Sequence, residues 1–299
     1  MMTYCLLKTG GSSIIMGSKY YTRFIPQKKG KLLKVTKLDD HHNELKYASV
    51  IKKIKDSSKY YSIPDEDIKV LEPSDTFYIF LKKLTKNHNM DIFGSSLHYM
   101  HVDYAGDTDV LSTLNNIIEY KDFGIWKSYR TVLKFAVHML KALDFLHDNK
   151  VCHLDIKAEN VVINTSFKQF RLIDFGYTTM YPFDDFVNDI KGTSCYFPKK
   201  MNDDEVTNWF PQIETNDMIK VNDMYPFQRN RHLVYKIDSY CLGRLLYFIT
   251  YIYRDNKINK CIKTDKKAEN KVTSITRVLL EPNIHNRVSV KECRFIFGV

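Results

Sequence analysis

The sequence predicts an α+β protein with two unequal parts, a small mainly β part followed by a larger mainly helical part. Its 299 residues, 44% of them apolar, can build one large domain or two small ones that share a cleft. Short runs typical of strands are confined to the start of the chain, whereas helical periodicity dominates from Trp126 onward. We place the boundary near Ala105, which gives an N-terminal lobe of residues 1–105 and a C-terminal lobe of residues 106–299.

The N-terminal part is expected to contain three strands and one helix. The candidate strands are short, rich in residues that favour extended backbone, and bounded by turn signals. They are Lys31–Val35, Thr76–Lys82 and His98–Tyr104, and the helix is expected near Asn43–Lys55.

The C-terminal part begins with the longest periodic stretch of the chain. Trp126–Asp148 places its apolar residues three and four positions apart, which predicts an amphipathic helix of about six turns. Two further helices are expected at Ser239–Tyr253 and Lys271–Leu280, and a short strand at Phe170–Ile173.

Charge, cysteine content and hydropathy exclude several classes of protein. The chain has 45 Lys+Arg against 35 Asp+Glu, a formal charge of +10; this favours anionic partners, but the basic residues are spread out and predict no dedicated nucleic-acid site. The six cysteines contain no CxxC pair, so neither a zinc site nor a disulfide framework is expected. Neither a signal peptide nor a transmembrane stretch is evident. We expect a soluble protein of the cytoplasm, a reducing compartment.

Two motifs carry the chemistry. His153–Asn160 reads H-L-D-I-K-A-E-N and directly follows the long predicted helix, and Asp174-Phe175-Gly176 follows the strand at Phe170–Ile173. Both resemble motifs of the eukaryotic protein kinase superfamily, whose catalytic loop reads H-R-D-x-K-x-x-N and whose metal-binding loop reads D-F-G. The order and the strand context of the two motifs also match that superfamily.

The resemblance implies a bilobal protein kinase fold, with a small mainly β N-lobe and a larger mainly α C-lobe, that transfers the γ-phosphate of ATP to protein hydroxyls with Mg²⁺. This reaction needs a carboxylate that accepts the proton of the attacking hydroxyl, a cation near the phosphoryl group, and oxygen ligands for Mg²⁺. Asp155, Lys157 and the pair Asn160 and Asp174 match these roles in that order. Lys157 together with Thr193 resembles the arrangement of serine/threonine kinases.

The glycine-rich loop that covers the phosphates in this family is only partly represented. Gly10 and Gly11 stand at its position, while the first and third glycines of the family pattern are absent. Two adjacent glycines still allow backbone N–H groups to approach a phosphate. Ile15 would cover the adenine.

Two lysines are candidates for the residue that binds the α- and β-phosphates. Lys34 and Lys37 both lie in or directly after the strand at residues 31–35. Their distances to Ile15 and to the following helix favour Lys34. Glu44 is the only glutamate in that helix and would pair with the lysine.

The strand at His98–Tyr104 resembles the family's hinge, which binds adenine through its backbone. Val102 would be the gatekeeper, and the backbones of Asp103 and Ala105 would face the base. Asp109 would reach the ribose, with an exposed loop aspartate as the alternative.

The later part of the chain both extends the resemblance and departs from it. Asp238 matches the aspartate that caps backbone amides of the catalytic loop. Lys199 replaces the glutamate of the family's A-P-E motif, so the usual ion pair to an arginine, here Arg287, is not expected. The stretch between Pro198 and Asp238 is long and predicts an insertion.

Leu154 stands where many relatives have an arginine that binds a phosphorylated activation loop. Because a phosphate gains order chiefly from such a guanidinium, we expect activity that does not depend on phosphorylation of this loop.

These departures resemble the divergent protein kinases of large cytoplasmic DNA viruses, which would place the protein in the host cytoplasm or inside virions. The expected partners are protein substrates, acidic or associated with nucleic acid; the sequence does not indicate the oligomeric state. The first alternative is a pseudokinase scaffold that binds nucleotide or partner proteins without efficient phosphotransfer. A basic nucleic-acid-binding protein is the second alternative, and the scattered basic residues disfavour it.

Overall fold

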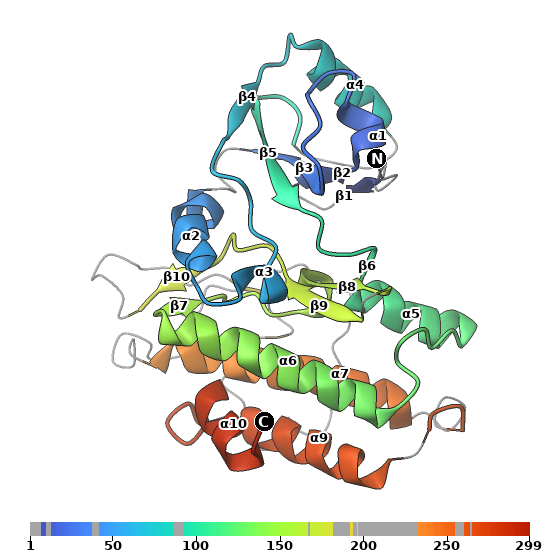
Figure 1. Cartoon of the computed structure of the whole chain (residues 1–299), viewed down its shortest axis with the longest axis vertical. Helices are drawn as coiled ribbons and strands as arrows, with labels where there is room; N and C mark the ends of the chain where they lie inside the picture. The colour runs from blue at the N-terminus through green and yellow to red at the C-terminus, as the bar shows by residue number, and fades with distance from the viewer. Residues whose placement is uncertain are drawn as a thin grey trace.

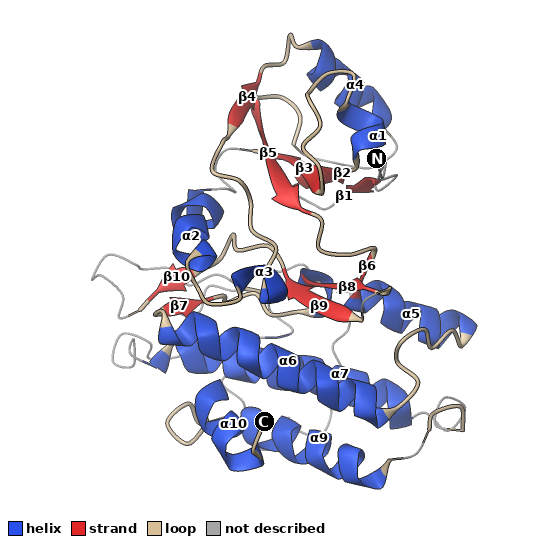
Figure 2. Cartoon of the chain, in the orientation of Figure 1, coloured by secondary structure: helices blue, strands red, loops and turns tan. Residues whose placement is uncertain are grey.

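The computed structural model describes residues 7–9, 13–37, 42–86, 92–166, 168–181, 192–193, 196, 233–254, 260–263 and 265–299. A β-sheet forms most of the N-terminal part, and the C-terminal part below it is mainly helical (Figure 1). Figure 2 shows the same division, with the longest helices in the lower part. The predicted α+β fold class is therefore confirmed.

The N-terminal sheet has five strands in the order β1-β2-β3-β5-β4, and all neighbours are antiparallel. Lys34 lies on β3, directly opposite Ile15 of β2 and Met100 of β5. Because side chains alternate along a strand, Leu32 shares the face of Lys34, and Leu33 and Val35 share the other face. The strands are β1 (Leu7–Thr9), β2 (Ser13–Met16), β3 (Lys31–Thr36), β4 (Lys69–Leu71) and β5 (Leu97–Asp103).

Two helices cover the sheet face opposite to Lys34. They are α1 (Ser18–Tyr21), between β2 and β3, and α4 (Thr76–Leu84), between β4 and β5. Apolar residues of both helices form one buried cluster with Leu33 and Val35. The strand predicted at Thr76–Lys82 is therefore wrong. Its aromatic and β-branched residues favour a strand locally, but a helix allows Phe77, Tyr78 and Leu81 to pack together on the sheet, and tertiary packing overrides the propensity.

The segment after helix α2 (His42–Lys52) joins the two parts of the molecule. It contains α3 (Ser57–Tyr60) and continues into Tyr61, whose backbone forms a bridge with Leu172. The Tyr61 hydroxyl donates to the Ala142 carbonyl at 2.5 Å. Tyr60 and Tyr61 belong to the large core cluster of the C-terminal part, so this N-terminal segment is anchored on the helical part.

The C-terminal part is built on two long helices, α6 and α7, which lie side by side (Figure 1). All three helices expected here are present, with ends shifted by a few residues from the predicted ones. The helices are α5 (Val110–Tyr120), α6 (Tyr129–Asp148), η1 (Ala158–Asn160), α7 (Tyr235–Arg254), α9 (Lys266–Leu279) and α10 (Val290–Phe297). The short strands are β6 (Thr108–Asp109), β7 (Val151–Cys152), β8 (Val161–Asn164), β9 (Gln169–Leu172) and β10 (Thr179–Met180).

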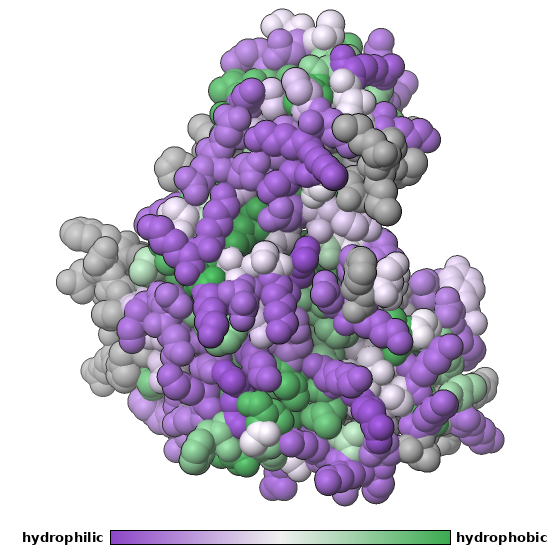
Figure 3. Space-filling view, in the orientation of Figure 1, coloured by the Kyte–Doolittle hydropathy of each residue, from purple (hydrophilic) through white to green (hydrophobic). Residues whose placement is uncertain are grey.

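The face of the molecule seen in Figure 3 is mostly hydrophilic, with apolar residues gathered over the lower helices. Phe295 and Ile296 of α10 are exposed. Among the described helices, none is both long enough and apolar enough to cross a membrane. The four cysteines in the described ranges, Cys152, Cys241, Cys261 and Cys293, are free thiols.

Candidate active site

A buried carboxylate holds the backbone of the loop that follows β7. Asp238 of α7 is fully buried, and its carboxylate oxygens accept hydrogen bonds from the backbone N–H groups of His153, at 2.8 Å, and Leu154, at 2.7 Å. Leu154 has a φ of 63°, in the left-handed region that residues other than glycine rarely adopt. The two bonds stabilise this unfavourable conformation, and the loop then places Asp155.

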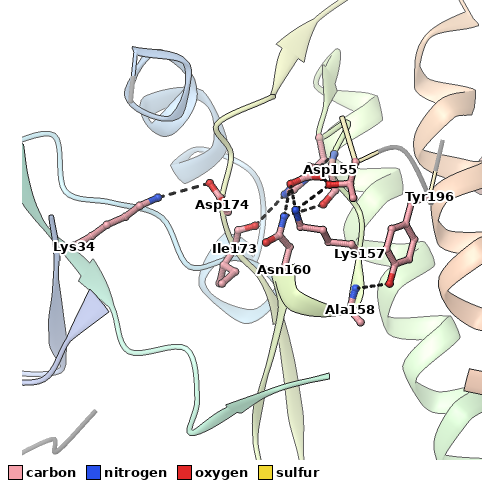
Figure 4. Close-up of polar contacts among 10 residues, drawn as sticks. Lys34, Asp155, Lys157, Ala158, Asn160, Ile173, Asp174 and Tyr196 are labelled. Atoms are coloured by element: carbon pink, nitrogen blue, oxygen red, sulfur yellow. Dashed lines mark hydrogen bonds and ion pairs between the residues drawn. The ribbon is translucent and has the colours of Figure 1, made fainter. Parts of the chain in front are cut away.

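Asp155 is the centre of a dense polar network (Figure 4). The side-chain amide of Asn160 donates to Asp155 Oδ2 at 2.7 Å and to the Asp155 carbonyl at 2.9 Å. Lys157 Nζ lies 3.0 Å from Asp155 Oδ2. Thr193 Oγ1 donates to Asp155 Oδ1 at 2.6 Å and accepts from Lys157 Nζ at 2.9 Å. Asp155 thus already binds one aliphatic hydroxyl, the group that a general base must orient.

The charge of Lys157 is maintained by its neighbours. Burial alone would lower the pKa of its ammonium group, but the nearby carboxylates, Asp155 first among them, together outweigh burial, and the pKa is raised. Lys157 is therefore a fixed cation beside the Asp155 carboxylate.

The second motif supplies a half-exposed carboxylate. Strand β9 leads into Asp174, whose side chain is 48% exposed and whose φ is 64°. Phe175 is buried, with its ring 4.9 Å from that of His153 and 6.0 Å from that of Tyr61. Burial lowers the pKa of His153, whose Nε2 lies 3.1 Å from the Ile173 carbonyl. These contacts fix the backbone on both sides of Asp174, and its carboxylate stays half-exposed.

Lys34 connects the sheet with helix α2 and with Asp174. Its Nζ lies 2.6 Å from Glu44 Oε2 and 3.6 Å from Asp174 Oδ1. Burial would lower the pKa of Lys34, but the two carboxylates raise it above its usual value. Lys37 follows the end of β3, so Lys34 is the lysine that the structure brings to Glu44.

The predicted hinge continues the sheet face that carries Lys34. Val102 packs with Leu32 and Met100, and Ile15 borders the same cluster. The Asp103 carbonyl accepts a hydrogen bond from Ser62 Oγ at 2.7 Å. This face is therefore an apolar surface next to backbone groups, which suits a planar base.

The end of the hinge is closely packed against β8. Ala105 is buried, and a Cβ atom on Gly106 would lie 2.2 Å from the Ile163 backbone oxygen. Only glycine fits at this position.

Asp109 lies at the end of this segment in a role that the sequence did not predict. It is 4% exposed, and its carboxylate caps helix α5 by accepting from the N–H and hydroxyl groups of Ser112. The exposed-loop alternative is therefore wrong, because the side chain is needed at the helix N-terminus. The ribose contact stays a prediction.

Comparison with known proteins identifies the family. Residues 29–295 match the protein kinase domain. The chain belongs to the protein kinase family. It is 35% identical over 92 residues to a probable cyclin-dependent serine/threonine-protein kinase of Dictyostelium discoideum, which is 28% of this chain and 6% of the relative. It is 41% identical over 63 residues to a serine/threonine-protein kinase of Schizosaccharomyces pombe, covering 21% of this chain and 15% of the relative.

A longer stretch of the chain is similar to the human dual specificity tyrosine-phosphorylation-regulated kinase 3. It has 29% identity over 152 residues, which is 50% of this chain and 24% of the relative. The chain thus spans a quarter or less of the length of each of these relatives. The similarity therefore supports a shared domain and not the activity of any whole relative.

The structure brings the residues chosen as catalytic or metal-binding together in two networks. Asp155, Lys157 and Asn160 form one network, and Lys34, Glu44 and Asp174 form another. Gly10, Gly11, Lys199 and the predicted insertion up to residue 232 lie outside the described residues.

Among the described residues, Arg287 bonds to backbone carbonyls. It is buried, and its guanidinium donates to the backbone carbonyls of Glu281, Pro282 and Lys236. In this kinase, Arg287 therefore ties the start of α7 to the segment before α10.

Sequence reasoning missed two residues that support the site. Tyr61 packs on Phe175 and reaches α6, and His147 of α6 lies 3.0 Å from Asp238 Oδ2 through its Nε2. Neither is part of a recognisable motif, because their contacts lie 81 and 91 residues away along the chain.

Proposed function

We propose that this protein is a serine/threonine protein kinase that transfers the γ-phosphate of MgATP to hydroxyl groups of proteins. The observation that carries the proposal is the position of Asp155. Its carboxylate contacts the Thr193 hydroxyl and the Lys157 ammonium group. Asp174 of the second motif contacts Lys34. The chain thus holds a carboxylate acceptor, a fixed cation and a half-exposed carboxylate close together (Figure 4), and these are groups that phosphoryl transfer requires.

In this mechanism Asp155 accepts the proton of the substrate hydroxyl as its oxygen attacks the γ-phosphorus, and the bond to the β-phosphate oxygen breaks. Lys157 offsets the negative charge that develops on the transferred group. Lys34, held by Glu44, would bind the α- and β-phosphates.

The residues present fit a Mg²⁺ ion. The Asn160 amide nitrogen donates to Asp155, so the Asn160 amide oxygen is left to bind a metal. This oxygen and the half-exposed Asp174 carboxylate would hold the ion, because Mg²⁺ prefers oxygen ligands. The ion would supply charge neutralisation on the phosphates.

Specificity for serine and threonine rests on Thr193 and Lys157 and on the names of two relatives, both serine/threonine-protein kinases. Thr193 Oγ1 contacts both catalytic side chains. A protein substrate also agrees with the family of the domain.

We further propose that activity does not depend on phosphorylation of the activation loop. Leu154 is buried and apolar, so no guanidinium is available at the usual place.

The viral grouping and the host-cytoplasm location rest on the departures from the family motifs and stay predictions. The pseudokinase scaffold remains the second candidate, motivated by the incomplete glycine motif.

The test is phosphate transfer by the purified chain from labelled ATP with Mg²⁺ to a panel of acidic and basic proteins, followed by phosphoamino-acid analysis. We expect label on serine and threonine. Nucleotide binding without transfer would favour the scaffold, and label on tyrosine alone would contradict the specificity.

A matched measurement tests the second proposal. Active protein is treated with a phosphatase, and mass spectrometry verifies that the loop carries no phosphate. The initial rate should stay within about tenfold, because the main partner for a phosphate is absent. A larger loss that rephosphorylation restores would contradict this expectation.

A further inference from the structure

The segment between β5 and β6, residues 104–107, carries the chain from the N-terminal sheet to the helical part (Figure 1). Its first residue is bound to the N-terminal part, because the Tyr104 N–H donates to the Gly30 carbonyl at 3.0 Å. The residue before it is held as well, since the Asp103 carbonyl accepts from Ser62 Oγ at 2.7 Å. These bonds fix the start of the segment on the sheet.

The end of the segment is bound to the C-terminal part. The Asp107 N–H donates to the Ile163 carbonyl of β8 at 3.0 Å, and the Asp107 carboxylate accepts from the N–H and hydroxyl groups of Thr165. Gly106 lies directly on β8, because a Cβ atom there would be 2.2 Å from the Ile163 oxygen. Ala105 therefore lies between an anchor on the N-terminal part and an anchor on the C-terminal part.

A guanidinium group connects the two anchors. Arg171 of β9 donates from Nη1 to the Tyr104 carbonyl at 3.1 Å. Arg171 stands directly opposite Val162 of β8, so both side chains lie on one face of this small sheet. Within the described ranges, no carboxylate forms an ion pair with Arg171. Because a guanidinium keeps its charge, the bond to Tyr104 has a charged donor and is stronger than a neutral hydrogen bond.

The planarity of the peptide bond transmits this contact to the next residue. The Tyr104 carbonyl and the Ala105 N–H belong to one rigid plane, and they point in opposite directions in the trans form that nearly all peptide bonds have. A guanidinium that fixes the carbonyl therefore also fixes the direction of the Ala105 N–H. The sequence predicts that the Ala105 backbone faces the adenine, and Ala105 is buried on the segment.

We propose that Arg171 is a positioning residue for the nucleotide base. It holds the peptide between Tyr104 and Ala105 so that the Ala105 N–H is already directed when it donates to an acceptor atom of the base. Ordering the segment before the ligand arrives removes an entropy cost from binding. The inference rests on the proposed function, because it takes an adenine nucleotide as the ligand. No described hydrogen bond joins Arg171 to Asp155 or Lys157, so the chemical step should not depend on it.

The first measurement is hydrogen exchange of the whole chain without nucleotide. Arg171→Met keeps an unbranched side chain but removes every donor, so the amides of residues 103–107 should exchange at least about threefold faster. Mass spectrometry of a peptide that covers these residues measures the rate. Arg130→Met is the matched control for the loss of one charge, because Arg130 is exposed on α6 and contacts Asp265. Its exchange at residues 103–107 should be unchanged.

The second measurement separates the base from the phosphates. The whole chain is titrated in Mg²⁺ with ADP and with ribose 5-diphosphate, which is the same compound without its base. Arg171→Met should weaken ADP binding at least about fivefold, because a hydrogen bond from a charged donor holds the base contact in place. It should change the binding of ribose 5-diphosphate by less than about twofold, since the phosphate ligands remain. A merely structural role would weaken both probes alike.

Kinetics and a conservative variant complete the test. In Arg171→Met the KM for ATP should rise at least about fivefold while kcat stays within about twofold. Arg171→Lys keeps a charged donor and should recover part of the affinity for ADP. If Arg171→Met does not melt as a folded protein, Arg171→Gln replaces it. This variant keeps only a neutral donor, so its ADP binding should fall at least about twofold.

Three results would overturn the inference. They are unchanged exchange at residues 103–107, unchanged binding of ADP, and equal weakening of ADP and ribose 5-diphosphate. The proposed function fails in a different way, because a natural chain that shows these effects on ADP binding but transfers no phosphate contradicts the kinase activity alone. A natural chain that binds no ADP would overturn both.

Discussion

The two parts of the molecule hold their candidate site residues in different ways. On the C-terminal side, Asp155 is 3% exposed and has contacts from Asn160, Lys157 and Thr193, while Asp238 fixes the backbone before it. On the N-terminal side, the position of Lys34 depends on Glu44 of a separate helix and on the half-exposed Asp174.

This difference has a physical consequence. Several contacts determine the position of the proposed catalytic carboxylate, so the loss of one atom should change the chemistry more than the fold. The lysine depends on one close ion pair between a strand and a helix, so its loss should change nucleotide binding.

The largest expected effect is that of Asp155→Asn. The variant keeps the size of the side chain but cannot accept a proton, so the initial rate should fall at least about a hundredfold. The affinity for ATP should stay nearly unchanged, because Lys34 and Asp174 remain. Steady-state kinetics and nucleotide titration measure the two quantities. Near-normal phosphotransfer by the variant would remove the basis for the enzyme assignment.

A pair of lysine variants tests the N-terminal side. Lys34→Met should abolish detectable phosphotransfer and weaken ATP binding, because it removes the cation beside Glu44. Lys37→Met is the matched control and should keep most of the activity, because it lies beyond the end of β3. The reverse result in the same assay would transfer the phosphate-binding role to Lys37.

Asp238→Asn should reduce both stability and rate. The new amide cannot accept from all three donors that now contact the carboxylate, those of His147, His153 and Leu154. Leaving buried donors unpaired should lower the free energy of unfolding by about 2–4 kcal/mol.

Denaturant unfolding and kcat measure these effects. Glu66→Gln, at a carboxylate that is 59% exposed, is the control for loss of a charge. If Asp238→Asn unfolds like the control, the left-handed Leu154 must be held by other contacts.

The smallest effect is expected at His138, where the two parts of the molecule meet. Its ring lies 4.8 Å from that of Tyr60, and burial lowers the pKa of His138 to about 4. The unfolded chain takes up this proton below about pH 6.5 and the folded chain only near pH 4. Stability should therefore fall as the pH drops from about 6.5 to 4, by at most about 3 kcal/mol from this group.

The measurement is the free energy of unfolding at pH 7 and pH 4.5. His138→Gln should lose less stability over this interval than the natural chain, and the exposed His285→Gln should lose as much as the natural chain. Identical pH profiles for all three proteins would show that His138 is readily protonated in the folded state.

Helix α4 shows where the sequence was insufficient. The stretch at residues 76–82 has the aromatic and β-branched content of a strand. It forms a helix because its apolar residues pack on the apolar face of the sheet. Asp109 shows the same limit for a site residue, because its role as a helix cap depends on the position of α5. In contrast, the sequence predicted the long helix at residues 129–148. Its apolar residues lie three and four positions apart, and the same spacing places them on the one face that packs on the core.

The sequence by itself determined the α+β class, the long helices and the two motifs that supply Asp155, Lys157, Asn160 and Asp174. These features are local, since each depends on spacing within about 20 residues. Tertiary structure decided which lysine meets Glu44 and which residues hold the left-handed backbone of Leu154. The physical reason is that these contacts join elements far apart in the chain, and only the packing of a sheet on a helical core brings them within hydrogen-bond distance.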